Sequence, residues 1–296
     1  MKLVLCVREW ILKKGLLRII PDFLYLKILY RYKMEHDLNL KLPRSYTEKL
    51  QWLKLNFRHD LLTSLVDKYE VREYVEKKIG KEYLIPLIGG PWDCYDYINY
   101  NSLPETFVLK TTHDSGGIVI CKDKKNFDRL FAKKKLESSL KNNFYWRYRE
   151  WPYKNVKPRI IAEKYMVDES GYELKDYKFF VFSGKVKALF IATDRTAKTD
   201  TCFDFYDRDF THLPIVNGHP NTKKEIKKPK RFEDMIQIAE KLGEDFPHVR
   251  IDLYNIDGSI YFGEFTFFHY SGLTPFEPEE WDYKFGEWLK LEEIGL

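Results

Sequence analysis

The chain has 296 residues, of which 44% are hydrophobic and 32% charged, and this places it among soluble globular proteins large enough for two lobes or one large domain. Its formal charge of +5 permits an anionic partner without requiring one. The four cysteines are scattered with no Cys-x-x-Cys pair, which argues against a zinc site or a disulfide framework and indicates a reducing compartment.

The first 40 residues are predicted to be a basic helical arm. Arg8 and Glu9 interrupt the opening hydrophobic run, so it is too short for a secretory signal or a membrane span, and we expect an intracellular, cytoplasmic protein. Pro21 divides the segment into two short helices, each with an apolar stripe and basic flanks. Such helices suit either a peripheral contact with the inner membrane surface or an arm docked on the protein itself.

Residues 45–79 are predicted to be helical. Ser45-x-x-Glu48 is a capping-box signal ahead of an apolar run, and a second helix follows over residues 67–79. Lys68 and Arg72 are four residues apart in this second helix, so they would share one of its faces. On spacing alone, a basic face that is solvated is the better interpretation.

A glycine-rich hairpin is predicted from residue 107. A strand over residues 107–112 and a return strand over residues 118–121 flank the turn His113-Asp-Ser-Gly-Gly. Backbone N–H groups at such a tip can approach phosphate oxygens, and Lys110 near the end of the first strand can add a charge. The same residues are also ordinary turn chemistry, and they match neither a Walker A loop nor a Rossmann fingerprint.

An aromatic and basic run follows a predicted basic helix at residues 127–142. In residues 144–154 aromatic rings alternate with cationic side chains, so the run could stack on nucleic-acid bases, line a sugar-binding surface or be a packed loop. On a sugar-binding surface, Arg149, Trp151 and Lys154 would contact the substrate, with a cation facing its carboxylate or phosphate. Only charge and aromatic content favour nucleic acid, so we expect no nucleic-acid partner.

The following residues are predicted to be mostly strands. One strand carries Glu163 and Lys164, and a hairpin around Ser183-Gly184 carries Lys178. After it we predict a long surface loop over residues 194–230 and a helix over residues 232–242.

Two carboxylates stand on the hairpin predicted over residues 249–266. Asp252 and Glu264 are separated by an even number of residues, so they share a face only if the connecting loop has an odd number of residues. A three-residue loop with Gly258 in the left-handed conformation would meet this condition. Acidic groups at close range repel each other, and Mg²⁺ relieves that repulsion. The pattern predicts a metal and phosphate site, although two solvated surface acids would also fit it.

The order of these motifs is similar to that of the ATP-grasp superfamily. The succession is Asp67-Lys68, Phe-Val-Leu-Lys110 with its Ser-Gly-Gly turn, Ala-Glu163-Lys164-Tyr, Lys178, Arg250-x-Asp252 and Gly-Glu264. Other segments, among them Glu150-Trp-Pro-Tyr-Lys and Pro278-Glu-Glu-Trp-Asp, resemble more narrowly its TupA-like branch, which is named for teichuronopeptide synthesis and often found among bacterial surface-polysaccharide genes. The resemblance covers roughly residues 40–296.

The resemblance implies an α+β protein with the ATP-grasp fold, in which two α+β lobes hold the nucleotide between antiparallel sheets. On this basis we expect four parts along the chain. They are a basic amphipathic helical arm at residues 1–40, an N-terminal helical region at 41–105, a small lobe with the glycine-rich loop at 106–165 and a large lobe with the Mg²⁺ site at 166–296.

The same resemblance assigns residues to ATP and Mg²⁺. Asp252 and Glu264 would bind Mg²⁺, and many members have Asn two residues after the second carboxylate, where this chain has Thr266. A second Mg²⁺ would therefore lack its usual amide ligand, unless another residue such as Asp176 replaces it. The residues that would bind the nucleotide are Lys68, Lys110, Ser115, Gly116, Gly117, Glu163, Lys164 and Lys178.

The implied activity is an ATP-dependent carboxylate–amine ligase that acts through an acylphosphate on a uronic acid or amino acid of a surface polysaccharide. Lys110, Arg250, His113 and His269 would serve in catalysis, the histidines as proton acceptors. Its substrates would be a glycan or sugar carboxylate and an amine. The alternatives are a phosphotransferase that leaves the phosphate on a sugar hydroxyl, and a glycosyltransferase, for which no nucleotide-sugar carboxylate motif is found.

Overall fold

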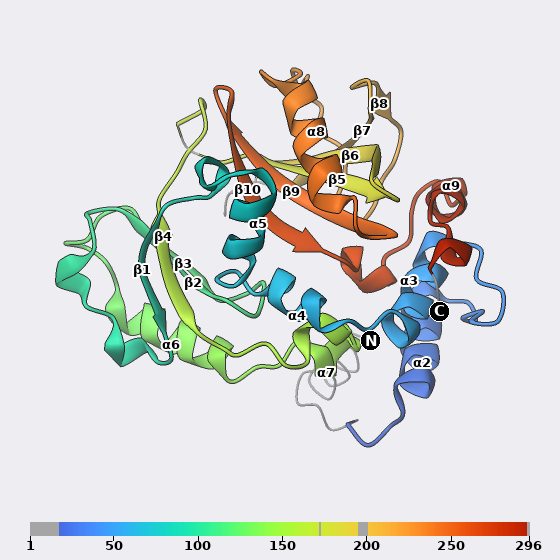
Figure 1. Ribbon diagram of the computed structural model, residues 1–296, viewed down its shortest axis with the longest axis horizontal. Helices are drawn as coiled ribbons and strands as arrows, with labels where there is room; N and C mark the ends of the chain where they lie inside the picture. Colours follow the sequence, from blue (N-terminus) through green and yellow to red (C-terminus); the bar gives the residue numbers. More distant parts are fainter. Residues whose placement is uncertain (1–17, 172, 195–200, 295–296) are drawn as a thin grey trace. The chain divides into compact units, whose positions relative to one another are not determined.

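The computed structural model describes residues 18–171, 173–194 and 201–294 (Figure 1). They form two compact units, each assembled from separate stretches of the chain. Unit 1 holds residues 18–38, 51–71 and 86–165, and unit 2 holds residues 39–50, 72–85 and the described part of 166–294.

Unit 1 is built on a four-stranded antiparallel sheet with the strand order β1-β4-β2-β3. Its strands are β1 (Leu87–Trp92), β2 (Phe107–Thr111), β3 (Ile118–Cys121) and β4 (Ile160–Lys164). Helix α6 (Arg129–Leu140) packs on one face, where Leu136 joins Phe107, Leu109 and Ile160 in a buried core. Because side chains alternate along a strand, Lys110 lies on the opposite face of β2.

The other helices of unit 1 are α2 (Asp22–Met34), α4 (Asp60–Val66) and α7 (Tyr145–Tyr148), with the short 3₁₀ turns η2 (Tyr95–Tyr97), η3 (Tyr100–Ser102) and η4 (Trp151–Tyr153). Pro21 precedes α2, as predicted, because proline is tolerated at the start of a helix. The first of the two predicted arm helices lies outside the described residues. Among the described residues, no helix combines the length and the apolar character that a membrane crossing requires.

Unit 2 is built on a six-stranded antiparallel sheet with the order β10-β9-β5-β6-β7-β8. Its strands are β5 (Asp176–Phe182), β6 (Lys185–Thr193), β7 (Cys202–Asp207), β8 (His212–Leu213), β9 (His248–Ile256) and β10 (Ser259–Thr266). Helix α8 (Phe232–Gly243) covers one face of this sheet (Figure 1). Phe179 and Val181 point to that face, since they lie against Phe232 and Gly243 of α8. The alternate residues Asp176, Lys178 and Phe180 therefore lie on the face opposite to α8.

The face opposite to α8 is covered over part of its area by an aromatic cluster. Phe180 contacts Phe190 of the next strand, Phe285 and Tyr46. Phe285 belongs to α9 (Glu280–Trp288) and Tyr46 to α3 (Tyr46–Asn56), whose later residues belong to unit 1. The remaining elements are α5 (Val71–Ile79), η1 (Lys81–Tyr83), η5 (His269–Gly272) and η6 (Leu291–Glu293).

Several predicted elements are confirmed and two are wrong. The capping box forms, since Ser45 N and Glu48 Oε2 are 3.3 Å apart and Glu48 N and Ser45 Oγ are 3.3 Å apart. The hairpin around Ser183-Gly184 joins β5 to β6. The loop predicted over residues 194–230 is wrong, because it contains β7 and β8.

The single helix predicted over residues 67–79 is also wrong, because α5 begins only at Val71. The Asp67 carboxylate explains the late start, since it accepts hydrogen bonds from the N–H groups of Tyr69 (2.7 Å) and Glu70 (3.0 Å) and so fixes a turn before the helix. Lys68 lies in this turn, and Arg72 lies in α5.

Candidate functional site

The β9–β10 hairpin places Asp252 directly opposite Glu264. The predicted three-residue loop is wrong, because the turn contains only Asp257 and Gly258, with φ of 49° and 95°. A two-residue turn alone would put Gly263 opposite Asp252. The register instead shifts by one residue between Phe262 and Glu264, so a β-bulge at Gly263 restores the shared face.

Glycine suits the bulge position for a steric reason. A Cβ atom on Gly263 would lie 3.0 Å from the carbonyl oxygen of Asp252, which is closer than nearly all real contacts of that kind. The predicted common face of Asp252 and Glu264 is thus confirmed, although a bulge and not an odd-numbered loop produces it.

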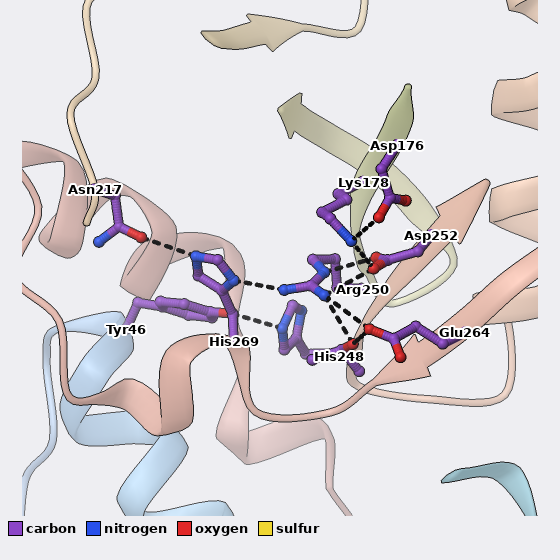
Figure 2. A network of polar contacts seen from close by, with 10 residues as sticks. Tyr46, Asp176, Lys178, Asn217, His248, Arg250, Asp252, Glu264 and His269 are labelled. Atoms are coloured by element: carbon purple, nitrogen blue, oxygen red, sulfur yellow. Dashed lines mark hydrogen bonds and ion pairs between the residues drawn. The ribbon is translucent and has the colours of Figure 1, made fainter. Parts of the chain in front are cut away.

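Two cations surround the Asp252 carboxylate (Figure 2). Arg250 donates to it through Nε at 2.7 Å and Nη2 at 2.8 Å, and Lys178 of β5 donates to its Oδ2. Lys178 also contacts Asp176 at 2.7 Å. Arg250 further donates to the Thr266 hydroxyl at 2.9 Å. Asp252 is buried with an exposed side-chain fraction of 1%, whereas the Glu264 side chain is 41% exposed.

The remaining edge of the Arg250 guanidinium faces a histidine. Nη1 of Arg250 donates to Nδ1 of His269 at 2.7 Å, and Nε2 of His269 lies 2.8 Å from Oδ1 of Asn217. Figure 2 shows the three side chains in line, with His269 in the middle. Sequence reasoning found Arg250 and His269 but missed Asn217, because a single asparagine in a loop carries no motif.

The charges of this network decide the protonation states. Burial alone would raise the pKa of Asp252, but Arg250 and Lys178 outweigh it and hold that pKa below its usual range. Burial alone would lower the pKa of Arg250, but Asp252 and Glu264 raise it above its ordinary value. Burial, reinforced by the charges of Arg250 and Lys178, lowers the pKa of His269 well below its ordinary value, so the imidazole is neutral.

Asp252 and Glu264 are the residues that could hold a metal ion together with a phosphate ligand. Asp252 and Glu264 bring oxygen ligands to one face, and Mg²⁺ is usually held by one or two carboxylates together with substrate phosphates and water. The described residues contain no group of three or more His, Cys, Asp and Glu side chains that could hold a metal ion. The Thr266 hydroxyl accepts a hydrogen bond from Arg250.

In unit 1, Lys110 and Glu163 form an ion pair at 2.6 Å on one face of the sheet. Their side chains are 18% and 8% exposed, so the pair is largely shielded from water. Lys164, the next residue on β4, is exposed. The structure thus joins two of the predicted nucleotide-binding residues, Lys110 and Glu163.

The turn with the sequence His113-Asp-Ser-Gly-Gly is organised by Asp114, which sequence reasoning did not single out. Its carboxylate accepts hydrogen bonds from the Thr111 hydroxyl (2.5 Å), the Gly117 N–H (3.0 Å) and the Ser139 hydroxyl. Lys68 donates to the Asp114 carbonyl. Only glycine fits at position 117, because a Cβ would lie 1.8 Å from Thr111 Oγ1. Ser115 and Gly116 are exposed at the tip of this fixed turn.

Two predicted polar residues of unit 1 are buried and engaged with the protein. His113 is 3% exposed, and its Nε2 donates to the carbonyls of Ser139 and Asn142, each at 3.1 Å. Burial lowers its pKa. Arg149 is 1% exposed, lies 3.1 Å from Asp22, and has its guanidinium over the ring of Tyr25. These placements favour structural roles over the predicted contacts with the substrate.

Trp151 and Lys154 are half-buried, and the Lys154 ammonium lies over the Trp151 ring at 4.9 Å from its centroid. Arg58 is also over this ring, at 4.9 Å. The indole of Trp151 is therefore bracketed by two cations, which is compatible with a site for an anionic group and equally with a packed surface loop.

Comparisons with known proteins give a family match. The family model described as TupA-like ATPgrasp matches residues 48–290. The chain is similar to D-alanine–D-alanine ligase from Bacillus anthracis complexed with ATP, with 16% identity and a TM-score of 0.41 over 79% of this chain and 70% of that one. It is also similar to L-amino acid ligase from Bacillus licheniformis, with 14% identity and a TM-score of 0.46 over 86% of this chain and 57% of that one.

The chain spans about three fifths of two further D-alanine–D-alanine ligase structures, 62% of the one from Bacillus anthracis and 61% of the one from Helicobacter pylori. The identities with these are 16% and 15%, and the TM-score is 0.39 for both. No curated protein matches the sequence.

Proposed function

Because the chain belongs to the TupA-like ATP-grasp family, we propose that it is an ATP-dependent ligase that joins a carboxylate to an amine. Its α+β architecture, with two antiparallel sheets, is the one expected for this family. One observation carries the proposal: Asp252 and Glu264 stand opposite each other beside Lys178 and Arg250. Paired carboxylates next to cations suit the handling of a metal-bound triphosphate.

We propose nucleotide-binding residues for each unit by itself. In unit 1 we assign Lys68, Lys110 and the exposed tip of the glycine-rich loop to the phosphates, and Glu163 and Lys164 to the adenosine. In unit 2 we assign Lys178 to the phosphates. Asp252 and Glu264 would hold Mg²⁺, which neutralises charge on the phosphate oxygens when it is bound.

The proposed reaction has two steps that balance. An oxygen of the substrate carboxylate attacks the γ-phosphorus of ATP, the bond to the bridging oxygen breaks, and ADP leaves with an acylphosphate remaining. The amine nitrogen then attacks the acyl carbon, inorganic phosphate leaves, and the nitrogen loses a proton. In this scheme Lys178 offsets charge on the phosphoryl group, and Arg250 keeps Asp252 ionised.

We further propose that the carboxylate is a uronic acid or an amino acid of a surface polysaccharide. The support is the arrangement at Trp151, where the ammonium of Lys154 and the guanidinium of Arg58 lie over the indole ring and supply two cations for a substrate carboxylate. Arg149 is left out of this proposal because Asp22 and aromatic rings already surround it.

A substrate screen tests the ligase. ADP release is measured with MgATP and pairs drawn from uronic acids and amino acids as carboxylates and from amino acids and amino sugars as amines. We expect release that requires both partners and falls by at least about 100-fold in Asp252→Asn. The matched control is Asp257→Asn in the turn of the same hairpin, where the carboxylate pairs only with the exposed Lys230, and it should stay within about twofold of wild type. ADP release with a hydroxyl acceptor and no amine would replace the ligase with a phosphotransferase.

We also propose that α2 lies on the inner membrane surface. Its inner face is buried through Leu26, Leu29 and Tyr30, while Phe23 and Ile28 are 53% and 56% exposed on the outer face. Lysine and arginine outnumber acids eight to two in the first 34 residues, which suits anionic lipid.

Vesicle sedimentation tests the membrane contact. Binding should be strong to vesicles that contain phosphatidylserine, weak to pure phosphatidylcholine, and reduced in the double variant Phe23→Ser and Ile28→Ser. Leu130→Ser on α6, where the leucine is 72% exposed, is the control and should bind as wild type does. Equal binding by both variants would contradict the assignment of α2.

A further inference from the structure

A buried chain of hydrogen bonds runs from a loop asparagine to the carboxylate of the candidate site. Asn217 contacts His269, His269 contacts Arg250, and Arg250 contacts Asp252, at 2.8, 2.7 and 2.7 Å. The four residues are between 1% and 8% exposed. At this depth an unmatched polar group costs about 1–3 kcal/mol, so the direction of each bond is strongly constrained.

The contacts of Asn217 decide which group donates and which accepts in its hydrogen bond with His269. Nδ2 of Asn217 donates to the carbonyls of Thr274 at 3.2 Å and Pro275 at 2.9 Å, and a carbonyl can only accept. Both amide N–H bonds are thereby used, and the side chain presents its oxygen to His269. The backbone beside it is held by two hydrogen bonds between Val216 and Glu277, each 2.8 Å long.

The contact with Arg250 independently decides the donors and acceptors at the His269 ring. A guanidinium has donors and no acceptor, so Nδ1 of His269 must accept from Arg250. Nε2 of the same ring must then carry the proton and donate it to Asn217. Both ends therefore select one neutral tautomer, with the proton on Nε2.

This arrangement gives His269 a role other than the proton acceptor that the sequence suggested. Its one lone pair already receives an Arg250 N–H, and its ring is held against Phe180, whose centroid is 5.0 Å away. The imidazole thus fixes the Nη1 corner of Arg250. The Nε and Nη2 groups of Arg250 donate hydrogen bonds to Asp252 and Thr266.

We infer that Asn217 and His269 are positioning residues that orient Arg250 on the metal-binding carboxylate through a locked neutral tautomer. The inference rests on the proposed function for its kinetic consequence and on geometry alone for the tautomer. Outer partners of a metal ligand commonly change activity by about 10-fold to 100-fold when they are removed, which sets the size of the expected effect.

Asn221 provides a matched control on the same loop. Its Nδ2 also donates to two backbone carbonyls, those of Phe203 at 2.7 Å and Ile215 at 2.9 Å, but none of its hydrogen bonds goes to His269. Asn217→Leu removes two loop hydrogen bonds and the His269 acceptor, whereas Asn221→Leu removes only two loop hydrogen bonds. A loss of activity due to loop disorder alone would be similar in the two variants.

The test combines ring-nitrogen NMR with kinetics. In the wild-type protein, the ¹⁵N shifts of His269 should report a single tautomer protonated on Nε2, and Asn221→Leu should leave both ring signals unchanged. In Asn217→Leu, Arg250 still selects this tautomer, but the Nε2 signal should shift because the Nε2–H loses its acceptor. With substrates, Asn217→Leu should lower kcat at least about 10-fold with the carboxylate KM within about twofold, and Asn221→Leu should keep kcat within about twofold.

Two results would overturn the inference. One is a wild-type His269 protonated on Nδ1 or present as a mixture of tautomers. The other is an equal kcat in the two leucine variants at a temperature where both are folded. The tautomer is measured without substrate and in wild-type protein, so it decides the matter even if the ligase activity is absent or Asn217→Leu does not fold.

Discussion

Arg250→Lys tests how far the stability of unit 2 depends on the shape of the Arg250 guanidinium group. The guanidinium makes two bonds to Asp252 at 2.7 and 2.8 Å, one to Thr266 at 2.9 Å and one to His269 at 2.7 Å. An ammonium keeps the charge but has a single nitrogen, which cannot reach both sides of the site at once. One bond to Asp252 would survive, and His269 would be left buried without its donor.

The expected loss follows from these contacts. Removing one partner of a buried, hydrogen-bonded charge pair costs about 3–5 kcal/mol. In Arg250→Lys part of the charge interaction with Asp252 is retained. The buried acceptor Nδ1 of His269 loses its donor, which costs about 1–3 kcal/mol. We therefore expect Arg250→Lys to lower the free energy of unfolding by about 2–4 kcal/mol.

Urea unfolding followed by tryptophan fluorescence measures this loss. The control is Arg208→Lys, because Arg208 is 46% exposed and pairs with Glu240 at the surface, and it should remain within about 1 kcal/mol of wild type. If Arg250→Lys is also within about 1 kcal/mol of wild type, the bidentate and histidine contacts do not hold the site together.

Three further predictions concern single groups. Lys110→Met should raise the ATP Kd at least about 10-fold in calorimetry and cost about 1–3 kcal/mol in unfolding, because it removes the ion pair with the nearly buried Glu163; an unchanged Kd would remove Lys110 from the nucleotide site. Asp114→Ala should free the glycine-rich turn, which hydrogen exchange at Gly117 N–H would report as faster; unchanged exchange would contradict the role of Asp114. Burial lowers the pKa of His248 from its ordinary 6.5 to about 3, so its contribution to stability is complete above pH 6.5 and is lost as the pH falls toward 3. Below pH 6, urea unfolding should show that the free energy of unfolding falls less steeply in His248→Gln than in wild type, by about 1.4 kcal/mol per pH unit. The same pH slope in both proteins would refute this role of His248.

The sequence predicted the strands that carry the site because their apolar residues alternate with polar ones at a fixed period. The predicted shared face of Asp252 and Glu264 is correct, but the prediction relied on an odd-numbered loop, whereas a two-residue turn and a bulge produce it. A bulge adds one residue to a strand, and the alternation of apolar and polar residues does not show where it lies. In the sequence alone, Gly263 therefore cannot be told from an ordinary strand residue. The strand β7 was missed because the surrounding segment is polar, rich in lysine and interrupted by proline and glycine, although Asp204 within the strand is buried and accepts from Thr222 N–H.

Roles that depend on distant partners were the hardest to predict. Arg149 has the residue type and the aromatic neighbours of a substrate-binding residue, but its carboxylate partner Asp22 lies far away in the sequence. His269 was identified as a proton acceptor because the sequence does not show that Arg250 occupies its lone pair. Asn217 could be identified only from the structure, in which its side chain makes three hydrogen bonds. Burial and bond direction, which decide these roles, are properties of the folded chain.

The most direct test of the proposed ligase follows an oxygen atom. The substrate carboxylate found in the screen is labelled with ¹⁸O, and the inorganic phosphate released with the amide is examined by mass spectrometry. An acylphosphate route transfers one carboxylate oxygen to phosphate, so we expect one ¹⁸O in each phosphate that forms with a product amide, and none of this phosphate when the amine is omitted. Unlabelled phosphate, or phosphate retained on the product, would contradict the proposed function.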